Sequence, residues 1–247
     1  MEIKGMKVVL TGASGGIGKA IARCLAEKGA DLILLGGTNA EKLKNFAEEL
    51  RKDFTERNVT FFPCDLTDDT ALNNAFMSAL SDKTVNGSVD VLINNAGIAY
   101  GAPFEETDLS VFDKIMALNF RSAVAVTKLA LPYIKRSDRG TIINIASVVA
   151  HNGYPEQSAY TASKHALLGF TKALAAELYK TGVRVHAVSP GGVYTDMIKI
   201  TRPDLTGEDM IMPEDVARIV LFLIENRTNA VIDEISVHRA NKQPFLG

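Results

Sequence analysis

Short apolar runs rich in β-branched residues alternate along the chain with longer stretches of helical periodicity. This alternation is typical of a parallel sheet covered by helices on both faces, because its strands are apolar throughout and each connection crosses over. The runs that predict strands are Lys7–Leu10, Asp31–Leu35, Val59–Pro63, Val89–Ile93, Thr141–Ile145, Val183–Val188 and Glu234–Val237. Helices are predicted at residues 16–28, 39–56, 68–83, 108–136, 158–180 and 213–225.

The length of 247 residues suits one undivided α/β unit, and no repeat or linker divides it. We therefore expect a single doubly wound, Rossmann-type α/β domain over residues 1–247, with a seven-stranded parallel sheet. The least patterned stretch, residues 197–212, is long for a connection in a compact domain. We expect it to be a substrate lid loop.

The charge balance and the cysteines exclude several classes of function. The formal net charge is -2 and no run of Lys or Arg is present, so the sequence gives no reason to expect nucleic-acid binding. No signal or membrane span is recognisable, which predicts a cytoplasmic protein without membrane contact. Cys24 and Cys64 lack metal-ligand spacing and disulfide density, so we expect two buried thiols and no metal site. A small-molecule partner is favoured.

A glycine-rich turn, Thr11-Gly12-Ala13-Ser14-Gly15-Gly16-Ile17-Gly18, follows the first predicted strand. Glycines let backbone approach a pyrophosphate, and free N–H groups at the start of the next helix bind its charge. The segment also matches Gly-x-Ser-x-Gly, which would make Ser14 a hydrolase nucleophile. No feature marks one histidine as its base, although four are candidates: His151, His165, His186 and His238. A serine hydrolase and a purely structural turn are the alternatives here.

Tyr160 and Lys164 stand four residues apart in a predicted helix, and Ser147 lies thirteen residues before the tyrosine. Positions i and i+4 share one helix face, so the ammonium can lie beside the phenol and favour its ionised form. Ser147 follows a strand and therefore lies at the sheet edge where open α/β folds bind ligands. The plainer interpretations are a surface tyrosine beside an exposed lysine and a serine that only forms a turn.

Taken together with Asn94-Asn95-Ala96-Gly97, Asn119 and the segment Pro190-Gly191-Gly192-Val193-Tyr194-Thr195, these motifs resemble the short-chain dehydrogenase/reductase family. They occur in the family's order between residues 11 and 195, and the chain is similar to the members that include β-ketoacyl carrier-protein reductases. The resemblance implies an NAD(P)-dependent oxidoreductase that interconverts a carbonyl and an alcohol. A catalytically idle dinucleotide-binding regulator is the alternative from another class.

The resemblance also implies catalytic roles. Tyr160 would be the acid/base, Lys164 would hold the nicotinamide ribose and lower the tyrosine pKa, and Ser147 would bind the substrate oxygen. Asn119 would hold a water of the proton relay through its helix. A free phenol has a pKa of ~10, so only about one in a thousand is ionised at pH 7, and alcohol oxidation needs a lowered pKa. Carbonyl reduction can use the neutral phenol as it stands.

Cofactor contacts are implied at the strand ends, where Asp65 could instead be a helix N-cap and Asn95 to Gly97 a plain turn. The implied residues are Gly12, Ser14, Gly16, Ile17, Gly18, Thr38, Asn39, Asp65, Leu66, Asn95, Ala96, Gly97, Tyr160, Lys164, Pro190, Gly191, Val193 and Thr195. At the end of the second strand, Gly37 takes the place of the acid that would bind an NAD ribose. NADP enzymes of the family often carry an arginine where this chain has Thr38. They also often carry a basic residue in the glycine turn, where this chain has Gly15. We expect NADP(H) to be preferred, with NAD(H) possible.

The sequence leaves the substrate and the assembly more open. Pocket candidates are Val149, His151, Tyr154, Gly192, Tyr194 and residues 197–212. His151 would either contact substrate or be a satisfied loop histidine. Similar proteins form homodimers through the helices at 108–136 and 158–180, and homotetramers through the last strand and helix. The absence of an Asp-Gly-Gly segment near residue 231 makes the tetramer contact the less supported of the two.

Overall fold

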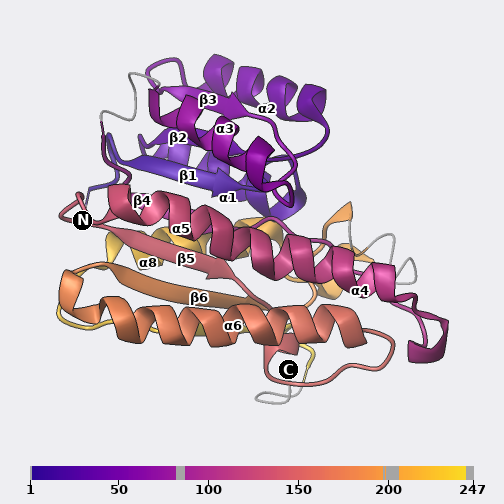
Figure 1. Cartoon of the computed structure of the whole chain (residues 1–247). Helices are drawn as coiled ribbons and strands as arrows, with labels where there is room; N and C mark the ends of the chain where they lie inside the picture. Colours follow the sequence, from indigo (N-terminus) through magenta and orange to yellow (C-terminus); the bar gives the residue numbers. More distant parts are fainter. Residues whose placement is uncertain (1, 82–86, 197, 199–205, 243–247) are drawn as a thin grey trace.

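The computed structural model of the chain describes residues 2–81, 87–196, 198 and 206–242. A seven-stranded, fully parallel sheet crosses the molecule in the order β3-β2-β1-β4-β5-β6-β7 (Figure 1). The strands are β1 (Lys7–Thr11), β2 (Asp31–Leu35), β3 (Val59–Phe62), β4 (Val91–Asn94), β5 (Thr141–Ile145), β6 (Arg184–Pro190) and β7 (Glu234–Val237). The single doubly wound domain predicted from the apolar runs is confirmed.

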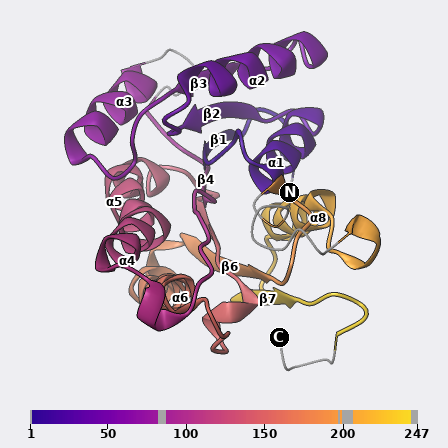
Figure 2. The ribbon, with the colours of Figure 1, turned by 90° about the vertical axis from the view of Figure 1, so that its right-hand side faces the viewer.

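Two layers of helices cover the sheet (Figure 2). One face carries α1 (Gly16–Glu27), α2 (Ala40–Asp53) and α8 (Pro213–Glu225), and the other carries α3 (Asp69–Ser81), α5 (Ser122–Ile134) and α6 (Ser158–Leu178). The helix α4 (Leu109–Met116) packs against α6. Because both faces are covered, β4 and β5 are buried along their whole length.

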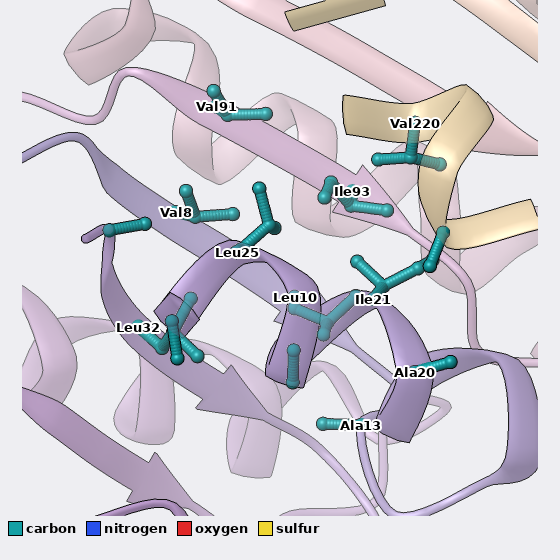
Figure 3. Packing of buried hydrophobic residues seen from close by; sticks show 14 of the residues in the cluster. Val8, Leu10, Ala13, Ala20, Ile21, Leu25, Leu32, Val91, Ile93 and Val220 are labelled. Carbon is teal, nitrogen blue, oxygen red and sulfur yellow. The ribbon is translucent and has the colours of Figure 1, made fainter. Parts of the chain in front are cut away.

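Local sequence explains why the covering helices form and where they dock. In α2, Leu43, Phe46 and Leu50 recur at helical spacing and are buried, and the Asn39 side chain caps the helix by accepting from the Lys42 N–H at 2.9 Å. In α1, Ile21 packs onto the sheet in the same way (Figure 3). Figure 3 also shows Leu25 of α1 over β1, and Val220 of α8 on the same side of the sheet. Burial of such side chains stabilises the fold by about 1.5–3 kcal/mol each.

The predicted helix at 108–136 is interrupted, which corrects the expectation of one continuous helix. Between α4 and α5, the segment η2 (Ala117–Arg121) is a π-helix, and the Ser122 N–H donates to the carbonyl of Ala117. Within this wider turn, the Asn119 side chain leaves the helix to bind backbone at Ile98. π-helical turns of this kind often occur at functional positions.

Several further details differ from the sequence predictions. Strand and helix ends shift by a few residues, and four short 3-10 helices were not predicted: η1 (Phe104–Glu106), η3 (Val148–Ala150), η4 (Tyr179–Thr181) and η5 (Gly207–Asp209). Cys24 and Cys64 are free thiols but only partly buried, because both lie at the margins of the core. Among the described residues, no helix combines the length and apolar character that crossing a bilayer requires.

A buried chain of polar side chains joins the centre of the sheet to the helices that cover it. The Asn94 amide donates to Thr127 Oγ1 at 3.0 Å and to Asn144 Oδ1 at 2.8 Å. The Asn144 amide in turn donates to Thr171 Oγ1 at 2.8 Å. Asn94 and Asn144 are also register partners on β4 and β5. The chain therefore holds the ends of both central strands against α5 and α6, directly below the sheet edge where the predicted site residues lie.

We expect Asn144→Ala to lower the free energy of unfolding by about 2–4 kcal/mol, because it leaves the buried Asn94 amide and Thr171 hydroxyl without this partner and opens a small cavity. Equilibrium unfolding in urea measures the change. Asn73→Ala, the same substitution on the exposed face of α3, is the control and should stay within about 0.5 kcal/mol of the parent protein. An equally small effect of Asn144→Ala would contradict the structural role of the chain.

Candidate active site

The carboxyl ends of the central strands open onto a cavity of about 510 Å³. Many residues that the sequence analysis singled out line this one cavity. They are Ile17, Asn95, Gly97, Ser147, Val149, Tyr154, Tyr160, Lys164, Pro190, Gly191, Gly192, Val193 and Thr195. Segments more than a hundred residues apart in the chain are brought together because parallel strands all end at the same edge of the sheet.

The glycine turn forms a cradle that side chains would fill. Gly12 has a φ of +67°, and a Cβ on it would lie 2.8 Å from the Cα of Ala96. A Cβ on Gly18 would lie 2.2 Å from the carbonyl oxygen of Gly12, and one on Gly16 would lie 2.6 Å from Thr195 Cγ2. These glycines therefore let the turn pack closely against Ala96 and Thr195, and at the start of α1 the N–H groups and the helix dipole favour a phosphate. These residues fit a dinucleotide.

Thr11 holds the cradle against the end of β4, a role that the sequence analysis did not assign to it. Its hydroxyl oxygen accepts hydrogen bonds from the N–H groups of Asn95 and Ala96, at 3.0 and 3.1 Å. The Asn95 side chain donates back to the carbonyls of Thr11 and Gly12, both at 3.1 Å. Asn95 is thus more than the plain turn residue considered as an alternative. The motif that contains Thr11 was the available signal, but its partner lies far along the chain.

Tyr160 and Ser147 both line the cavity, and the Ser147 hydroxyl donates to the Pro190 carbonyl at 3.3 Å. Burial raises the pKa of the Tyr160 phenol, and the neighbouring Ser147 hydroxyl lowers it by less. The net upward direction differs from the lowered pKa that we inferred from the lysine neighbour. The physical reason is that Lys164 Nζ lies 5.8 Å from the centre of the phenol ring and donates to another group, so desolvation dominates.

Lys164 is buried, with 5% of its surface exposed, and its ammonium donates to the carbonyl oxygen of Ile145 at 2.8 Å. Burial lowers the pKa of this lysine to about 8. An ammonium has three donors, so further hydrogen bonds are available to a ligand in the cavity. Gly97 keeps this space open, since a Cβ there would lie 3.8 Å from Lys164 Nζ and 3.2 Å from Asn119 Oδ1.

Asn119 is buried below the cavity and does not line it. Its Oδ1 accepts from the Ile98 N–H at 2.8 Å, while its amide donates to the Ile98 carbonyl at 2.8 Å and to Ser163 Oγ at 3.0 Å. The side chain therefore ties the π-helical turn to the strand end after β4 and to α6. Any contact of Asn119 with a relay water would have to use its backbone.

The predicted adenosine end lies along the same edge, after β2 and β3, outside the cavity lining. Gly37 has a φ of +98°, and Thr38 beside it is exposed. Asn39 already uses its side-chain oxygen to cap α2, which leaves its amide for a ligand. Asp65 accepts from the N–H and hydroxyl of Thr67, and these hydrogen bonds lower the pKa of its carboxyl. It is not the N-cap of α3, because Asp68 performs that role.

Two of the substrate-pocket candidates do not line the cavity, namely His151 and Tyr194. His151 Nε2 lies 2.7 Å from Glu234 Oε1, so the satisfied loop histidine is the correct one of our two interpretations. Of the proposed lid, Met197 and residues 199–205 lie outside the described residues. At its far end, Ile211 bridges to Val193 and accepts from the Tyr194 N–H at 2.8 Å.

The geometry gives no support to Ser14 as a hydrolase nucleophile. A nucleophilic serine needs a histidine within hydrogen-bond reach. The ring nitrogens that form hydrogen bonds contact other groups: Glu234 for His151, and backbone carbonyls for His165, His186 and His238. In the described part of the chain, Ser14 therefore has no base.

The cavity also contains residues that the sequence analysis missed. They are Ala99, Tyr100, Gly101, Ile145, Ala146, Val148, Pro155, Glu156, Gln157, His238, Arg239 and Lys242, whereas Ile198 and Met210 belong to the pocket candidates at 197–212. His238, Arg239 and Lys242 are the residues of this set nearest the C-terminus. All three follow β7, and nothing in their spacing signals that the end of the chain returns to the cavity. Their position depends on the pairing of β7 with β6, which places residue 237 beside Pro190.

Comparisons with known proteins give matches over most of the chain. A family model described as short chain dehydrogenase matches residues 6–206. The D-beta-hydroxybutyrate dehydrogenase of Rhizobium meliloti (strain 1021) is 33% identical over 214 residues, which cover 87% of this chain and 81% of that protein.

Solved structures resemble the chain over nearly its whole length. An alcohol dehydrogenase from the archaeon Thermococcus sibiricus, complexed with 5-hydroxy-NADP, matches with a TM-score of 0.86 and 26% identity, over 97% of this chain and 98% of that one. A 3-ketoacyl-(acyl-carrier-protein) reductase from Brucella melitensis, complexed with NADH, matches with a TM-score of 0.83 and 25% identity, over 96% and 97%.

The buried lysine predicts a specific pH dependence of stability. Burial lowers its pKa from 10.5 to about 8, so between these values the unfolded chain binds a proton that the folded chain has released. The lysine's contribution to stability therefore rises with pH across this window. We expect the free energy of unfolding of the parent protein to increase relative to Lys164→Met by about 2 kcal/mol between about pH 7 and about pH 10.

Urea unfolding of both proteins at several pH values measures this difference. The control is Lys180→Met, which removes an exposed lysine and should show no such trend relative to the parent. A difference between the parent and Lys164→Met that is independent of pH would show that the ammonium is not desolvated in the fold.

Proposed function

The chain belongs to the short-chain dehydrogenase family and is an oxidoreductase that acts on CH–OH groups, and from this premise we propose that Tyr160, Ser147, Lys164 and Asn119 carry its chemistry. The substrate is a small carbonyl or alcohol, and the preferred cofactor is NADP(H). The observation that carries this proposal is that Tyr160 and Ser147 line one cavity together with the buried Lys164.

The state of the phenol favours carbonyl reduction. Because burial raises the pKa of Tyr160, the phenol is neutral at pH 7 and can donate its proton to a carbonyl oxygen that Ser147 also binds. Donation leaves a phenolate, which the nearby Lys164 ammonium stabilises. Asn119 acts as a positioning residue, because its two hydrogen bonds to Ile98 hold the strand end beside Lys164.

The glycine cradle and the strand ends would hold the dinucleotide. A bound nicotinamide supplies or accepts the hydride. The N–H groups at the start of α1 would bind the pyrophosphate at the closely packed turn of Gly12, Gly16 and Gly18, and Lys164 has donors for ribose hydroxyls. Asp65 and Leu66 lie at the adenine end, while Pro190, Gly191, Val193 and Thr195 lie at the nicotinamide end of this assignment.

The preference for NADP(H) rests on the residues that follow β2. Gly37 carries no acid to repel a 2′-phosphate, and Thr38 with the free amide of Asn39 offers donors to it. The start of α2 adds its dipole. The segment Gly36–Asn39 contains no arginine that would bind the 2′-phosphate strongly. The proposal therefore leaves NAD(H) as a usable second cofactor.

We also propose a cytoplasmic homo-oligomer with a substrate lid between residues 197 and 212. Exposed apolar side chains support self-association through the α4–α5 region. Phe104, in η1 before α4, and Leu109, the first residue of α4, are 73% and 80% exposed. No observation favours the idle regulator or the serine hydrolase as a second function.

We expect Tyr160→Phe to lower kcat for carbonyl reduction by about 10²- to 10⁴-fold, because the proton donor is lost. The Kd for NADPH, measured by the fluorescence of the bound cofactor, should change little. Tyr179→Phe removes an exposed hydroxyl at the opposite end of α6 and should leave the rate unchanged. A rate within about tenfold of the parent for Tyr160→Phe would show that another group donates the proton.

The cofactor assignment predicts a higher kcat/KM with NADPH than with NADH on one substrate. Thr38→Asp should reduce the kcat/KM for NADPH by about tenfold or more, because a carboxylate would face the 2′-phosphate, and should spare NADH. Steady-state rates with both cofactors, for the parent and the variant, measure the two ratios. A parent protein that prefers NADH would overturn the assignment.

A further inference from the structure

The segment after β7 forms a basic wall of the cavity, consisting of His238, Arg239 and Lys242. A hydrogen bond holds its beginning beside the end of β6. The Gly191 N–H donates to the carbonyl of Val237 at 2.7 Å, and a Cβ on Gly191 would lie 3.7 Å from the Cα of His238. The basic wall therefore starts beside the strand end that carries Pro190 and Gly191.

Arg239 extends across this wall. Its Cδ lies 3.9 Å from the position of a Cβ on Gly192, and its Nη1 donates to Met210 Sδ at 3.4 Å. The aliphatic part of the side chain thus lies along Gly192 and Met210 while the residue lines the cavity. A backbone hydrogen bond of 3.0 Å from the Lys242 N–H to the Arg239 carbonyl turns the chain and brings Lys242 to the same cavity.

Among the described residues, the positive charges of this wall are not balanced by carboxylates. In the part of the chain that the structure describes, the basic side chains of Lys164, Arg239 and Lys242 line the cavity against one carboxylate, Glu156. Within the described ranges, neither Arg239 nor Lys242 forms an ion pair with a carboxylate. A thioether is a weak acceptor and Arg has five donors, so the guanidinium retains most of its capacity for an anion.

We propose that the basic wall recognises an anionic group on the substrate, a carboxylate or a phosphate, while the carbonyl to be reduced lies at Tyr160 and Ser147. Arg239 provides the fork of donors for the anion and Lys242 adds a second positive charge. The substrates are therefore oxo acids or phosphorylated ketones, in preference to their neutral counterparts. This inference rests on the proposed function, because it assigns the substrate class of the same cavity.

Matched neutral and anionic substrates test the proposal. Acetoacetate and levulinate would be compared with their methyl esters, and dihydroxyacetone phosphate with dihydroxyacetone, by following NADPH oxidation. We expect kcat/KM for at least one anion to exceed that of its neutral partner by about tenfold or more, because a charge-assisted hydrogen bond is gained. Whether the oxo acids or the phosphorylated ketone show the preference distinguishes carboxylate from phosphate.

The variant Arg239→Met keeps the aliphatic stem and removes the charge. Its kcat/KM for the preferred anion should fall by about 10- to 100-fold, mainly through KM, while the neutral partner and the Kd for NADPH stay within about threefold. Arg239→Lys should recover part of the loss. Arg136→Met, an exposed arginine at the end of α5, is the matched control and should change neither substrate.

Titration calorimetry separates this inference from the proposed function. The anion that is preferred in the assay, or levulinate if nothing is turned over, is titrated into protein saturated with NADP⁺. Binding that weakens at least tenfold in Arg239→Met supports the basic wall even if the chemistry at Tyr160 is wrong. Reduction of neutral ketones at the same rate as anions, with no effect of Arg239→Met on rate or binding, overturns the basic wall and leaves the proposed function standing.

Discussion

The buried ammonium of Lys164 is the constraint on which the geometry of the site depends. Removing a cation from water is costly unless it is hydrogen-bonded, and this ammonium has one backbone acceptor, the carbonyl that ends β5. The helix α6 must therefore hold the Lys164 ammonium against the end of β5. The bond from Asn119 to Ser163 and the missing side chain of Gly97 fix the spacing between α6 and the backbone after β4. A polar ligand in the cavity completes the solvation that the fold leaves partial.

Much of the fold could be predicted from the sequence because the strands are buried on both faces. Runs such as Thr141–Ile145 are apolar enough to be recognised alone, and α2 shows its core face at Leu43 and Leu50. The π-helical turn at Asn119 could not be predicted in the same way. The Asn119 side chain in this turn bonds to Ile98, twenty-one residues earlier in the chain. The local spacing of apolar residues does not indicate such a distant contact.

The candidate site was predictable to the extent that its residues lie at strand ends. Ser147 and Tyr160 both line the cavity because Ser147 follows the end of β5 and Tyr160 lies in the first turn of α6. Long-range electrostatics were less accessible: the spacing of Tyr160 and Lys164 indicated a lowered phenol pKa, whereas burial raises it. The pairing of His151 with Glu234 and the return of Arg239 to the cavity both depend on β7, which sequence spacing does not relate to the rest.

The two glycines that follow β2 limit which mutations can change the choice of cofactor. Gly36 and Gly37 have φ values of +89° and +98°, and a Cβ on Gly36 would lie 2.7 Å from Leu66. A residue with a side chain in such a conformation pays about 1–2 kcal/mol in backbone strain. An acid at Gly37, the substitution that would favour an unphosphorylated ribose, is therefore opposed by the turn itself. Substitution of the exposed neighbour Thr38 is less opposed. The conformation of the turn therefore limits the positions at which a single mutation can change cofactor specificity.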